Sequence, residues 1–227
     1  IAVARAGTDV LVLEYQEALG GVGTVGLIGK PYHGLEIGFA KEVPFPTKQY
    51  NGEYKMEWLR REIRKAGGSI WVGALTYGAC KRGNRVYGLA VATPYGAGVV
   101  LAKTVIDATG NADVAAAAGA QCSFGGDDSD IALQGTGLPM RPIGKDYVNT
   151  DYLLVDETDV IDVTRAMIGS KQAVDPDSCY DAAPFIQSRE RRCIVGDVTL
   201  SYLDQLLGRT YPDSVVLSKS DYDSHGY

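Results

Sequence analysis

The side chains best suited to chemistry lie near the C-terminal end of the chain. Arg189, Arg191 and Arg192 surround Glu190, and His225 lies two residues from the last position. An arginine guanidinium binds a carboxylate through two parallel hydrogen bonds, and a histidine exchanges a proton near neutral pH. We therefore predict Arg192 and His225 as catalytic candidates. A charged helix face paired with Glu190 and a loop histidine bonded to backbone are the structural alternatives.

Residues able to bind a metal are few. The two histidines, His33 and His225, lie far from one another in the sequence, and no two cysteines form a C-x-x-C pair. Zinc and iron–sulfur sites usually take such closely spaced ligands, so we predict no metal site. Isolated cysteines in an apolar setting are more typical of small core residues. The four cysteines are Cys80, Cys122, Cys179 and Cys193.

An acidic residue ends an apolar run near the start of the chain. Residues 1–7 are typical of a helix that ends at a glycine, and residues 8–13 are typical of a strand buried in a parallel sheet. Helix, glycine, strand and acid match the second half of a βαβ dinucleotide-binding unit, where the acid accepts hydrogen bonds from ribose hydroxyls. We predict this role for Glu14; a solvated carboxylate is the alternative.

A glycine-rich loop follows, and Gly21, Gly23 and Gly26 satisfy G-x-G-x-x-G. That fingerprint requires the acid about 20 residues downstream and a helix directly after the glycines. Here Glu14 lies upstream and Pro31 opposes a helix, so we expect the true fingerprint before the first residue of this chain. Glycines nevertheless let a ligand approach the backbone closely. The predicted cofactor contacts in the loop are Gly20, Gly21, Gly23 and Thr24.

Periodicity and turn signals divide the next hundred or so residues into elements. Residues 31–68 form an irregular excursion that ends in an amphipathic helix over 54–66. Three strands are predicted over 69–76, 84–93 and 98–107, with a Pro-Tyr-Gly turn before the third. An alanine-rich helix is predicted over 112–118. Further on, we predict helices over 164–168 and 201–207 and a strand over 215–217.

The third strand leads into Asp107-Ala108-Thr109-Gly110 and then into Asn111-Ala112-Asp113, before the alanine-rich helix. Together with Val12-Leu13-Glu14 and the glycine loop, this series resembles the FAD-dependent oxidoreductases of the glutathione-reductase-type Rossmann superfamily. The stretch 189–197 is similar to the R-E-x-R-x-x-x-G-D of that family, and 218–226 looks like its sequel. The resemblance is spread in order along nearly the whole chain.

The resemblance implies a set of contacts with FAD. Glu14 would hold the ribose, and the loop over 20–24 would lie near the pyrophosphate and ring. Ala74 and Leu75 would approach the adenine through their backbone. Ala108, Thr109 and Gly110 would pack where only a small backbone profile fits.

The resemblance also implies a fold class. We expect an α/β fold in which an FAD/NAD(P)-binding, Rossmann-like parallel sheet carries a three-stranded β crossover, with part of a mixed α+β substrate or cap domain. Residues 1–122 would form an incomplete FAD-binding domain, and 123–227 would begin the substrate or cap domain. The chain is expected to be a fragment lacking the N-terminal fingerprint and the C-terminal part of the flavin pocket. As given, we expect it to be inactive and to hold FAD weakly.

Charge and hydropathy narrow the partners. The chain has 227 residues with 22 Lys and Arg against 28 Asp and Glu, a net charge of −6. Acidic proteins without basic runs are poor partners for nucleic acid, and no apolar stretch reaches the length of a membrane span. We expect a small-molecule substrate and an unknown electron acceptor. The oligomeric state and the compartment stay open, with the cytoplasm favoured.

The predicted function is hydride transfer between a small organic substrate and flavin by an FAD-dependent oxidoreductase. An NAD(P)-binding Rossmann enzyme is the first alternative, because an acid after the second strand serves NAD equally well. The predicted three-strand crossover opposes it, because a simple NAD domain would alternate strands and helices there. A non-catalytic module that keeps the flavoprotein fold is the second alternative.

Overall fold

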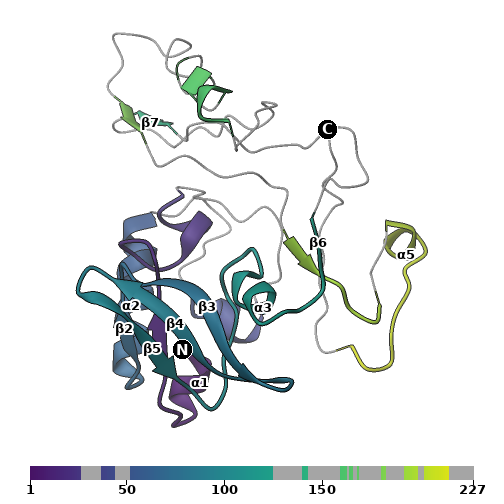
Figure 1. The fold of residues 1–227 in the computed structure, drawn as a ribbon. Helices are drawn as coiled ribbons and strands as arrows, with labels where there is room; N and C mark the ends of the chain where they lie inside the picture. The colour runs from purple at the N-terminus through teal and green to yellow at the C-terminus, as the bar shows by residue number, and fades with distance from the viewer. Residues whose placement is uncertain are drawn as a thin grey trace.

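Figure 1 shows the computed structural model of the chain. The structure describes residues 1–26, 37–43, 52–124, 140–142, 159–162, 164–165, 168, 180–182, 192–198 and 202–214. All statements on structure below refer to these residues.

The N-terminal elements form a small parallel α/β unit. Helix α1 (Ala2–Arg5) ends before Gly7, whose φ of +85° is the left-handed conformation expected of a glycine after a helix. Strand β1 (Leu11–Leu13) pairs in parallel with β2 (Ser69–Trp71), with Leu11 opposite Ser69. The predicted helix end, glycine and strand are therefore confirmed.

Helix α2 (Gly52–Lys65) connects the two parallel strands and confirms the predicted amphipathic helix. Trp58 and Ile63 are buried on one face, while Glu57 and Arg60 form an ion pair of 2.6 Å on the exposed face. Basic residues fill its last turn, where they complement the negative end of the helix dipole. Parallel strands need such a crossover connection, so α2 sets the geometry of the β1–β2 pair.

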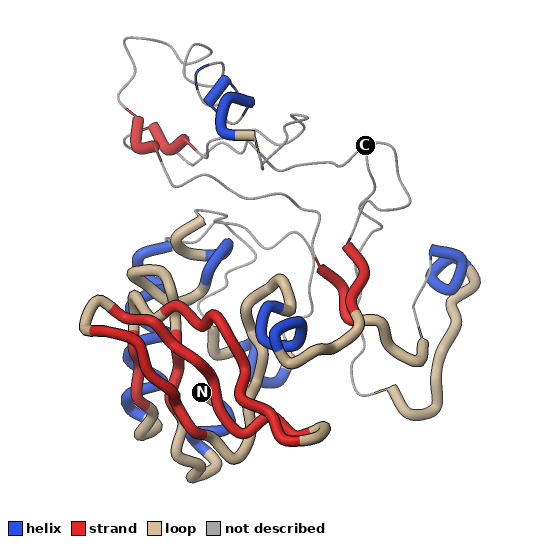
Figure 2. The backbone as a smooth tube through the Cα atoms, in the orientation of Figure 1, coloured by secondary structure: helices blue, strands red, loops and turns tan. Residues whose placement is uncertain are grey.

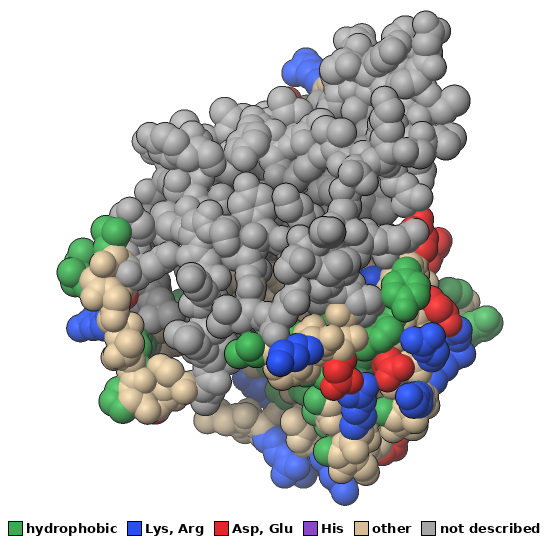
Figure 3. All heavy atoms as spheres, turned by 180° about the vertical axis from the view of Figure 1, so that it is seen from behind, with side chains coloured by type: hydrophobic (Ala, Val, Ile, Leu, Met, Phe, Trp, Pro, Cys, Tyr) green, Lys and Arg blue, Asp and Glu red, His purple; other side chains and the backbone are tan. Residues whose placement is uncertain are grey.

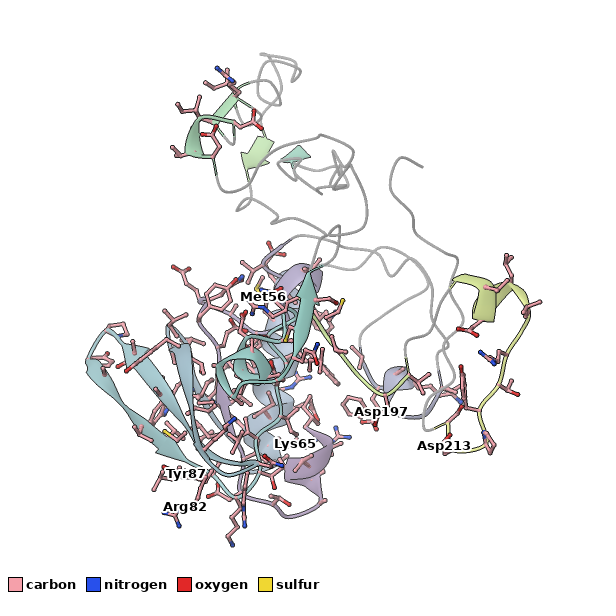
Figure 4. All side chains as sticks on the ribbon, turned by 45° about the vertical axis from the view of Figure 1, so that its right-hand side comes forward. Met56, Lys65, Arg82, Tyr87, Asp197 and Asp213 are labelled. Carbon is pink, nitrogen blue, oxygen red and sulfur yellow. The ribbon has the colours of Figure 1, made fainter. Side chains whose placement is uncertain are left out.

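A three-stranded antiparallel sheet follows, with the order β3-β4-β5. Its strands are β3 (Leu75–Arg82), β4 (Arg85–Thr93) and β5 (Gly96–Leu101). These are the long red strands at the front of Figure 2. Near the β3–β4 turn, the guanidinium of Arg82 lies 5.9 Å from the ring centre of Tyr87, and both are labelled in Figure 4. The predicted three-stranded crossover is thus present.

Two predicted strand boundaries are wrong. Residues 69–76 do not form one strand: β2 stops at Trp71, Gly73 has a φ of +65°, and β3 begins at Leu75 and continues to Arg82. The left-handed glycine bends the chain from the parallel sheet into the antiparallel one. Similarly, the strand predicted over 98–107 begins at Gly96 and ends at Leu101. The Ala102 N–H still donates to the Tyr87 carbonyl, but the backbone over 103–107 makes no ladder hydrogen bond with the described residues.

Helix α3 (Asp113–Ala117) confirms the predicted alanine-rich helix and packs beside β3. After it, β6 (Cys122–Phe124) pairs in an antiparallel manner with β9 (Arg192–Ile194), which lies far along the sequence. A second antiparallel pair consists of β7 (Met140–Pro142) and β8 (Tyr180–Ala182). Helix α5 (Tyr202–Leu206) confirms the helix predicted over 201–207. The described residues within 164–168 are helical, and the strand predicted over 215–217 lies outside the described residues.

The combination of a parallel strand pair, a helical crossover and an antiparallel three-stranded sheet is the α/β arrangement expected from the sequence. Two short 3-10 helices, η1 (Gly21–Gly23) and η2 (Gly38–Lys41), lie between β1 and α2 in the described part of the chain. Among the described residues, no helix is long and apolar enough to cross a lipid bilayer.

Candidate functional site

Glu14 lies directly after β1, where the parallel strands end. Its backbone N–H donates to the Trp71 carbonyl, and its own carbonyl accepts the N–H of Ala74, both at 2.9 Å. Its side-chain Oε1 accepts the backbone N–H of Gln16 at 2.9 Å. Among the described residues, none donates a hydrogen bond to Oε2. The carboxylate is therefore held in place through one oxygen, while the other can accept a hydroxyl of a ligand.

The two residues predicted to meet adenine lie beside Glu14. Ala74 is buried, and its hydrogen bond to the Glu14 carbonyl fixes the backbone between β2 and β3. Leu75 opens β3, with 53% of its surface exposed. The structure thus brings Glu14, Ala74 and Leu75 to one end of the parallel strand pair.

Residues 20–26 fold into a compact loop around the side chain of Thr24. The fully buried Thr24 hydroxyl donates to the Leu19 carbonyl at 2.7 Å, and the Thr24 N–H donates to the Gly21 carbonyl at 3.0 Å. Gly20 has a φ of +107°, and a Cβ there would lie 2.6 Å from Thr24 Cγ2. At Gly21, by contrast, a Cβ would meet no described atom within 4 Å. Thr24 therefore supports the loop from within, and no described atom occupies the Cβ position of Gly21.

The Asp107–Gly110 turn is held by the Asp107 carboxylate. Asp107 Oδ1 accepts the Thr109 N–H at 3.0 Å and the Thr109 hydroxyl at 2.7 Å, and Oδ2 accepts the Ala115 N–H at 2.9 Å. The Thr109 hydroxyl oxygen in turn accepts the Asp113 N–H at 3.0 Å. Asp107 therefore joins the turn to the first turn of α3. Gly110, with a φ of +77°, has no described atom within 4 Å of a Cβ position.

Two opposing effects act on the pKa of Asp107. Partial burial raises the pKa of its carboxyl, because the charged form loses hydration. The hydrogen bonds from the Ala115 and Thr109 backbone, the Thr109 hydroxyl and the Val114 backbone together lower it further than burial raises it. The net pKa lies below its ordinary value, so the turn contains a carboxylate at neutral pH.

Arg192 opens β9 and contacts the loop after this turn. Its backbone N–H donates to Asn111 Oδ1 at 2.8 Å, and its Nη1 forms an ion pair with Asp113 Oδ1 at 2.9 Å. The Asn111 amide Nδ2 also donates to Asp113 Oδ1, at 3.0 Å. The guanidinium predicted to meet an anion therefore has one nitrogen bound to Asp113. The role of Arg192 toward a substrate stays a prediction.

Several predicted residues lie outside the described part of the chain: His225, His33, Arg189, Arg191 and Cys179. The other three cysteines, Cys80, Cys122 and Cys193, form no disulfide bond with one another. No three His, Cys, Asp or Glu side chains within the described segments are grouped so as to hold a metal ion.

Asn111 and Asp113 belong to the motif quoted for the family resemblance, but no contact was predicted for their side chains. Asp113 begins an alanine-rich helix two residues after Asn111, and both residue types are common where a helix starts. Their presence there needs no contact with a distant residue. The contact with Arg192 joins positions 79 apart in the sequence, and no local pattern reports it. The hydrogen bond from the Thr109 N–H to the Asp107 carboxylate, by contrast, is of a local kind, because an aspartate side chain often accepts the backbone N–H two residues further on.

The described groups fit a dinucleotide. A carboxylate with an accepting oxygen suits ribose hydroxyls, and Gly21 and Gly110, with no described atom at their Cβ positions, are compatible with close approach of a flat or charged group. The predicted residues fall into local groups around Glu14, Thr24 and Asp107, each held by the hydrogen bonds described above.

Comparison with known proteins gives one family. A family model described as FAD dependent oxidoreductase matches residues 1–157. No curated protein matches the chain.

Solved structures also resemble the chain. The crystal structure of THI4 from Thermovibrio ammonificans is 21% identical, with a TM-score of 0.40 over 60% of this chain and 59% of that one. BexE, studied for oxidation during BE-7585A biosynthesis, is 16% identical, with a TM-score of 0.53 over 84% of this chain and 49% of that one. CabE, an aromatic hydroxylase from angucycline biosynthesis, is 15% identical, with a TM-score of 0.47 and the same coverage.

The likeness to BexE concerns the fold alone, given the low identity. This chain spans about half to three fifths of the length of the three structures.

Proposed function

Because the chain belongs to the FAD-dependent oxidoreductase family, whose cofactor is FAD, we propose that the full-length protein transfers a hydride between a small organic substrate and the flavin. The flavin, when bound, supplies the redox chemistry, and the protein supplies binding, orientation and electrostatics.

The observation that carries this proposal is the geometry of Glu14. Its backbone lies between Trp71 and Ala74, and its Oε1 is held by the Gln16 N–H. These bonds fix the carboxylate at the end of β1, where the ribose-binding acid of a dinucleotide site belongs. We propose that Oε2 accepts ribose hydroxyls, and that Ala74 and Leu75 lie along the adenine.

The loop and the turn supply the remaining contacts. Gly20, Gly21, Gly23 and Thr24 would border the pyrophosphate, with Thr24 holding the loop from within. Ala108, Thr109 and Gly110 would pack against the cofactor through small side chains and backbone. Both segments are compatible with close approach, because neither Gly21 nor Gly110 has a neighbouring described atom at the Cβ position.

Arg192 and His225 are the proposed catalytic candidates. Arg192 would place a positive charge near an anionic substrate group, and His225 would hold or release a proton there. The division into a cofactor domain over 1–122 and a substrate or cap domain from 123 onward is part of the same proposal.

The first test asks whether the full-length protein binds FAD. The purified protein should be yellow, with a flavin absorption band and FAD, rather than FMN, released on denaturation. Titration of the apoprotein with FAD and with NADH separates the proposal from an NAD(P)-binding enzyme. A colourless protein that takes up no FAD under any condition contradicts the proposal.

The second test concerns chemistry. Anaerobic mixing of the yellow protein with small organic acids, alcohols and amines should bleach the flavin band with one class of compound. In protein saturated with FAD, Arg192→Ala should then lower turnover by about 100- to 1000-fold, since electrostatic and acid–base groups contribute on this scale. Turnover equal to that of the unaltered protein would remove Arg192 from the catalytic candidates.

A further inference from the structure

A continuous chain of hydrogen bonds connects the Asp107–Gly110 turn to β9. It begins at the Asp107 carboxylate, passes through the Thr109 hydroxyl at 2.7 Å and reaches the Asp113 N–H at 3.0 Å. From the Asp113 carboxylate it continues to Arg192 Nη1 at 2.9 Å. The turn proposed to pack against FAD is therefore linked to a strand that lies 79 positions beyond Asp113.

At the far end of this chain, hydrogen bonds form a ring of Asn111, Asp113 and Arg192. Its Oδ1 accepts the Arg192 N–H at 2.8 Å, its Nδ2 donates to Asp113 Oδ1 at 3.0 Å, and its carbonyl lies 3.4 Å from Arg192 Nη1. Both the backbone and the guanidinium of Arg192 are thus bound by one short loop. Two points of attachment fix the orientation of a segment better than one, because they restrain its rotation as well as its position.

The loop itself has an uncommon backbone. Ala112, between the two residues that bind Arg192, has a φ of +52° and a ψ of +35°, the left-handed conformation. It is the one residue other than glycine with a positive φ among those that the structure describes. Such a conformation is costly for alanine, so the surrounding hydrogen bonds must maintain it.

Strand β9 has further attachments beside α3. It pairs with β6 through Cys122 opposite Ile194, and the Val195 N–H donates to the Gln121 carbonyl at 2.9 Å. Figure 1 shows β6 and α3 as neighbours, and α3 in turn packs on β3. The N-terminal end of β9 is the part that reaches the Asn111–Asp113 loop.

We propose that Asn111 and Asp113 are positioning residues that couple the docking of β9 to the binding of FAD at the Asp107–Gly110 turn. This proposal rests on the proposed function, since it requires that the turn contact the cofactor. FAD binding stabilises the turn, the ordered turn places Asn111 and Asp113, and these bind Arg192. By linkage, docking of β9 strengthens FAD binding by the same factor.

The size of the effect follows from the exposure of the ion pair. The Arg192 and Asp113 side chains are 31% and 48% exposed, so solvent weakens their attraction. Together with the hydrogen bonds of Asn111, the ion pair should give a coupling between β9 docking and FAD binding at the lower end of the range usual for allosteric coupling. We therefore expect about a fivefold change in FAD affinity.

The first experiment is a double-mutant cycle on the full-length protein. The dissociation constant for FAD is measured by fluorescence titration of the apoprotein for Arg192→Ala, Asp113→Ala and the double variant. Each single variant should weaken FAD binding about fivefold, and the double variant should be no weaker than either single one. Arg192→Lys, which can keep the ion pair, should restore most of the affinity.

A control is available in Arg209, whose Nη1 lies 2.8 Å from Asp204 Oδ1 in an ion pair of similar length, with Arg209 62% and Asp204 13% exposed. Arg209→Ala should leave FAD affinity unchanged. A loss as large as that of Arg192→Ala would mean that loss of an ion pair elsewhere in the chain has the same effect, and would overturn the proposal. Additive effects of Arg192→Ala and Asp113→Ala would overturn it as well.

The second experiment measures the coupling from the other side. In the unaltered protein, FAD should slow amide hydrogen exchange in a peptide that covers residues 192–198, and this slowing should be lost in Asp113→Ala. Exchange in β9 that does not respond to FAD, in a protein shown to bind FAD, overturns the coupling and leaves the proposed function intact. A protein that binds no FAD fails the proposed function instead, so the two failures are distinguishable.

Discussion

At the scale of single residues, Glu14 combines a fixed backbone with a carboxylate oxygen that can accept a ligand. The Trp71 carbonyl and the Ala74 N–H fix its main chain, and the Gln16 N–H fixes Oε1. Preorganisation of this kind favours binding, because little conformational entropy is lost when the ligand arrives. The role of Glu14 can be tested directly by substitution.

Glu14→Ala in the full-length protein should weaken FAD binding by about 10- to 100-fold, the effect of losing a charge-assisted hydrogen bond. The measurement is the dissociation constant for FAD by fluorescence titration. Glu17→Ala is the matched control, because Glu17 is an exposed acid in the same loop. If Glu14→Ala retains FAD as well as the control does, Glu14 does not contact the cofactor.

Gly20 offers a second test at this scale. A Cβ there would lie 2.6 Å and 2.7 Å from Thr24 side-chain atoms and 3.0 Å from Leu59 Cδ1, at a φ of +107°. Gly20→Ala should lower the free energy of unfolding by about 1–3 kcal/mol through overpacking. Gly21→Ala, at a φ of +54° with open space, should cost only about 1 kcal/mol for the left-handed backbone. Urea unfolding of both variants gives the comparison, and equal losses would contradict the clash.

At the scale of elements, α3 depends on a side chain outside it. The Asp107 carboxylate accepts the Ala115 N–H, which lies in the first turn of α3. It therefore caps the helix as an N-cap side chain would, although it lies several residues upstream. Ala112, which precedes α3, makes no side-chain cap of its own. The turn and the helix should therefore lose order together when the carboxylate is lost.

Asp107→Asn should lower the free energy of unfolding at neutral pH by about 1–2 kcal/mol, because both carboxylate oxygens accept hydrogen bonds and the amide nitrogen of Asn cannot accept one. The pKa of Asp107 is lower in the folded state than in the unfolded state, so its stabilisation is present above the unfolded value of about 3.9 and is lost as the pH falls through the folded pKa. Urea midpoints at pH 7 and pH 3 should show the variant and the unaltered protein converging at low pH. A difference that is constant with pH would show that the carboxylate charge does not contribute.

At the scale of the whole molecule, Arg5 joins elements far apart in the sequence. From the end of α1, its Nη1 donates to Glu42 at 2.7 Å after η2, and its Nη2 donates to Glu62 at 2.9 Å in α2. Its guanidinium also lies 5.5 Å from the ring centre of Phe39, which packs near Trp58. On the face shown in Figure 3, basic and acidic side chains of the described residues lie intermingled.

Arg5→Ala should lower the urea midpoint of unfolding more than Arg60→Ala does. Arg60 pairs with Glu57 within one helix, whereas Arg5 is the partner of the buried Glu62 and connects three elements. The hydrogen bond from Arg5 lowers the pKa of Glu62, so this stabilisation is present above the ordinary glutamate pKa of about 4.3 and decreases as the pH falls. Equal midpoints for the two variants would show that the Arg5 contacts add nothing beyond a surface pair.

The sequence alone determined the features that depend on neighbours along the chain. The glycine after α1, the amphipathic pattern of α2 and the alanine-rich run of α3 each specify local backbone geometry within one or two turns. The short apolar strand before Glu14 was recognisable for the same reason, and the ordered motifs indicated the family. These signals are carried by consecutive residues and need no distant partner.

Only the tertiary structure decided which distant groups meet. The hydrogen bond between the Ala74 N–H and the Glu14 carbonyl, 60 positions apart, holds the chain in place between β2 and β3, and the pairing of β5 with β4 reaches only as far as Leu101 opposite Gly88. The attachment of Arg192 to Asn111 and Asp113 likewise spans 81 and 79 positions. Hydrogen bonds and ion pairs act over a few ångströms regardless of sequence separation, so their partners are fixed by the packing of the elements and not by local pattern.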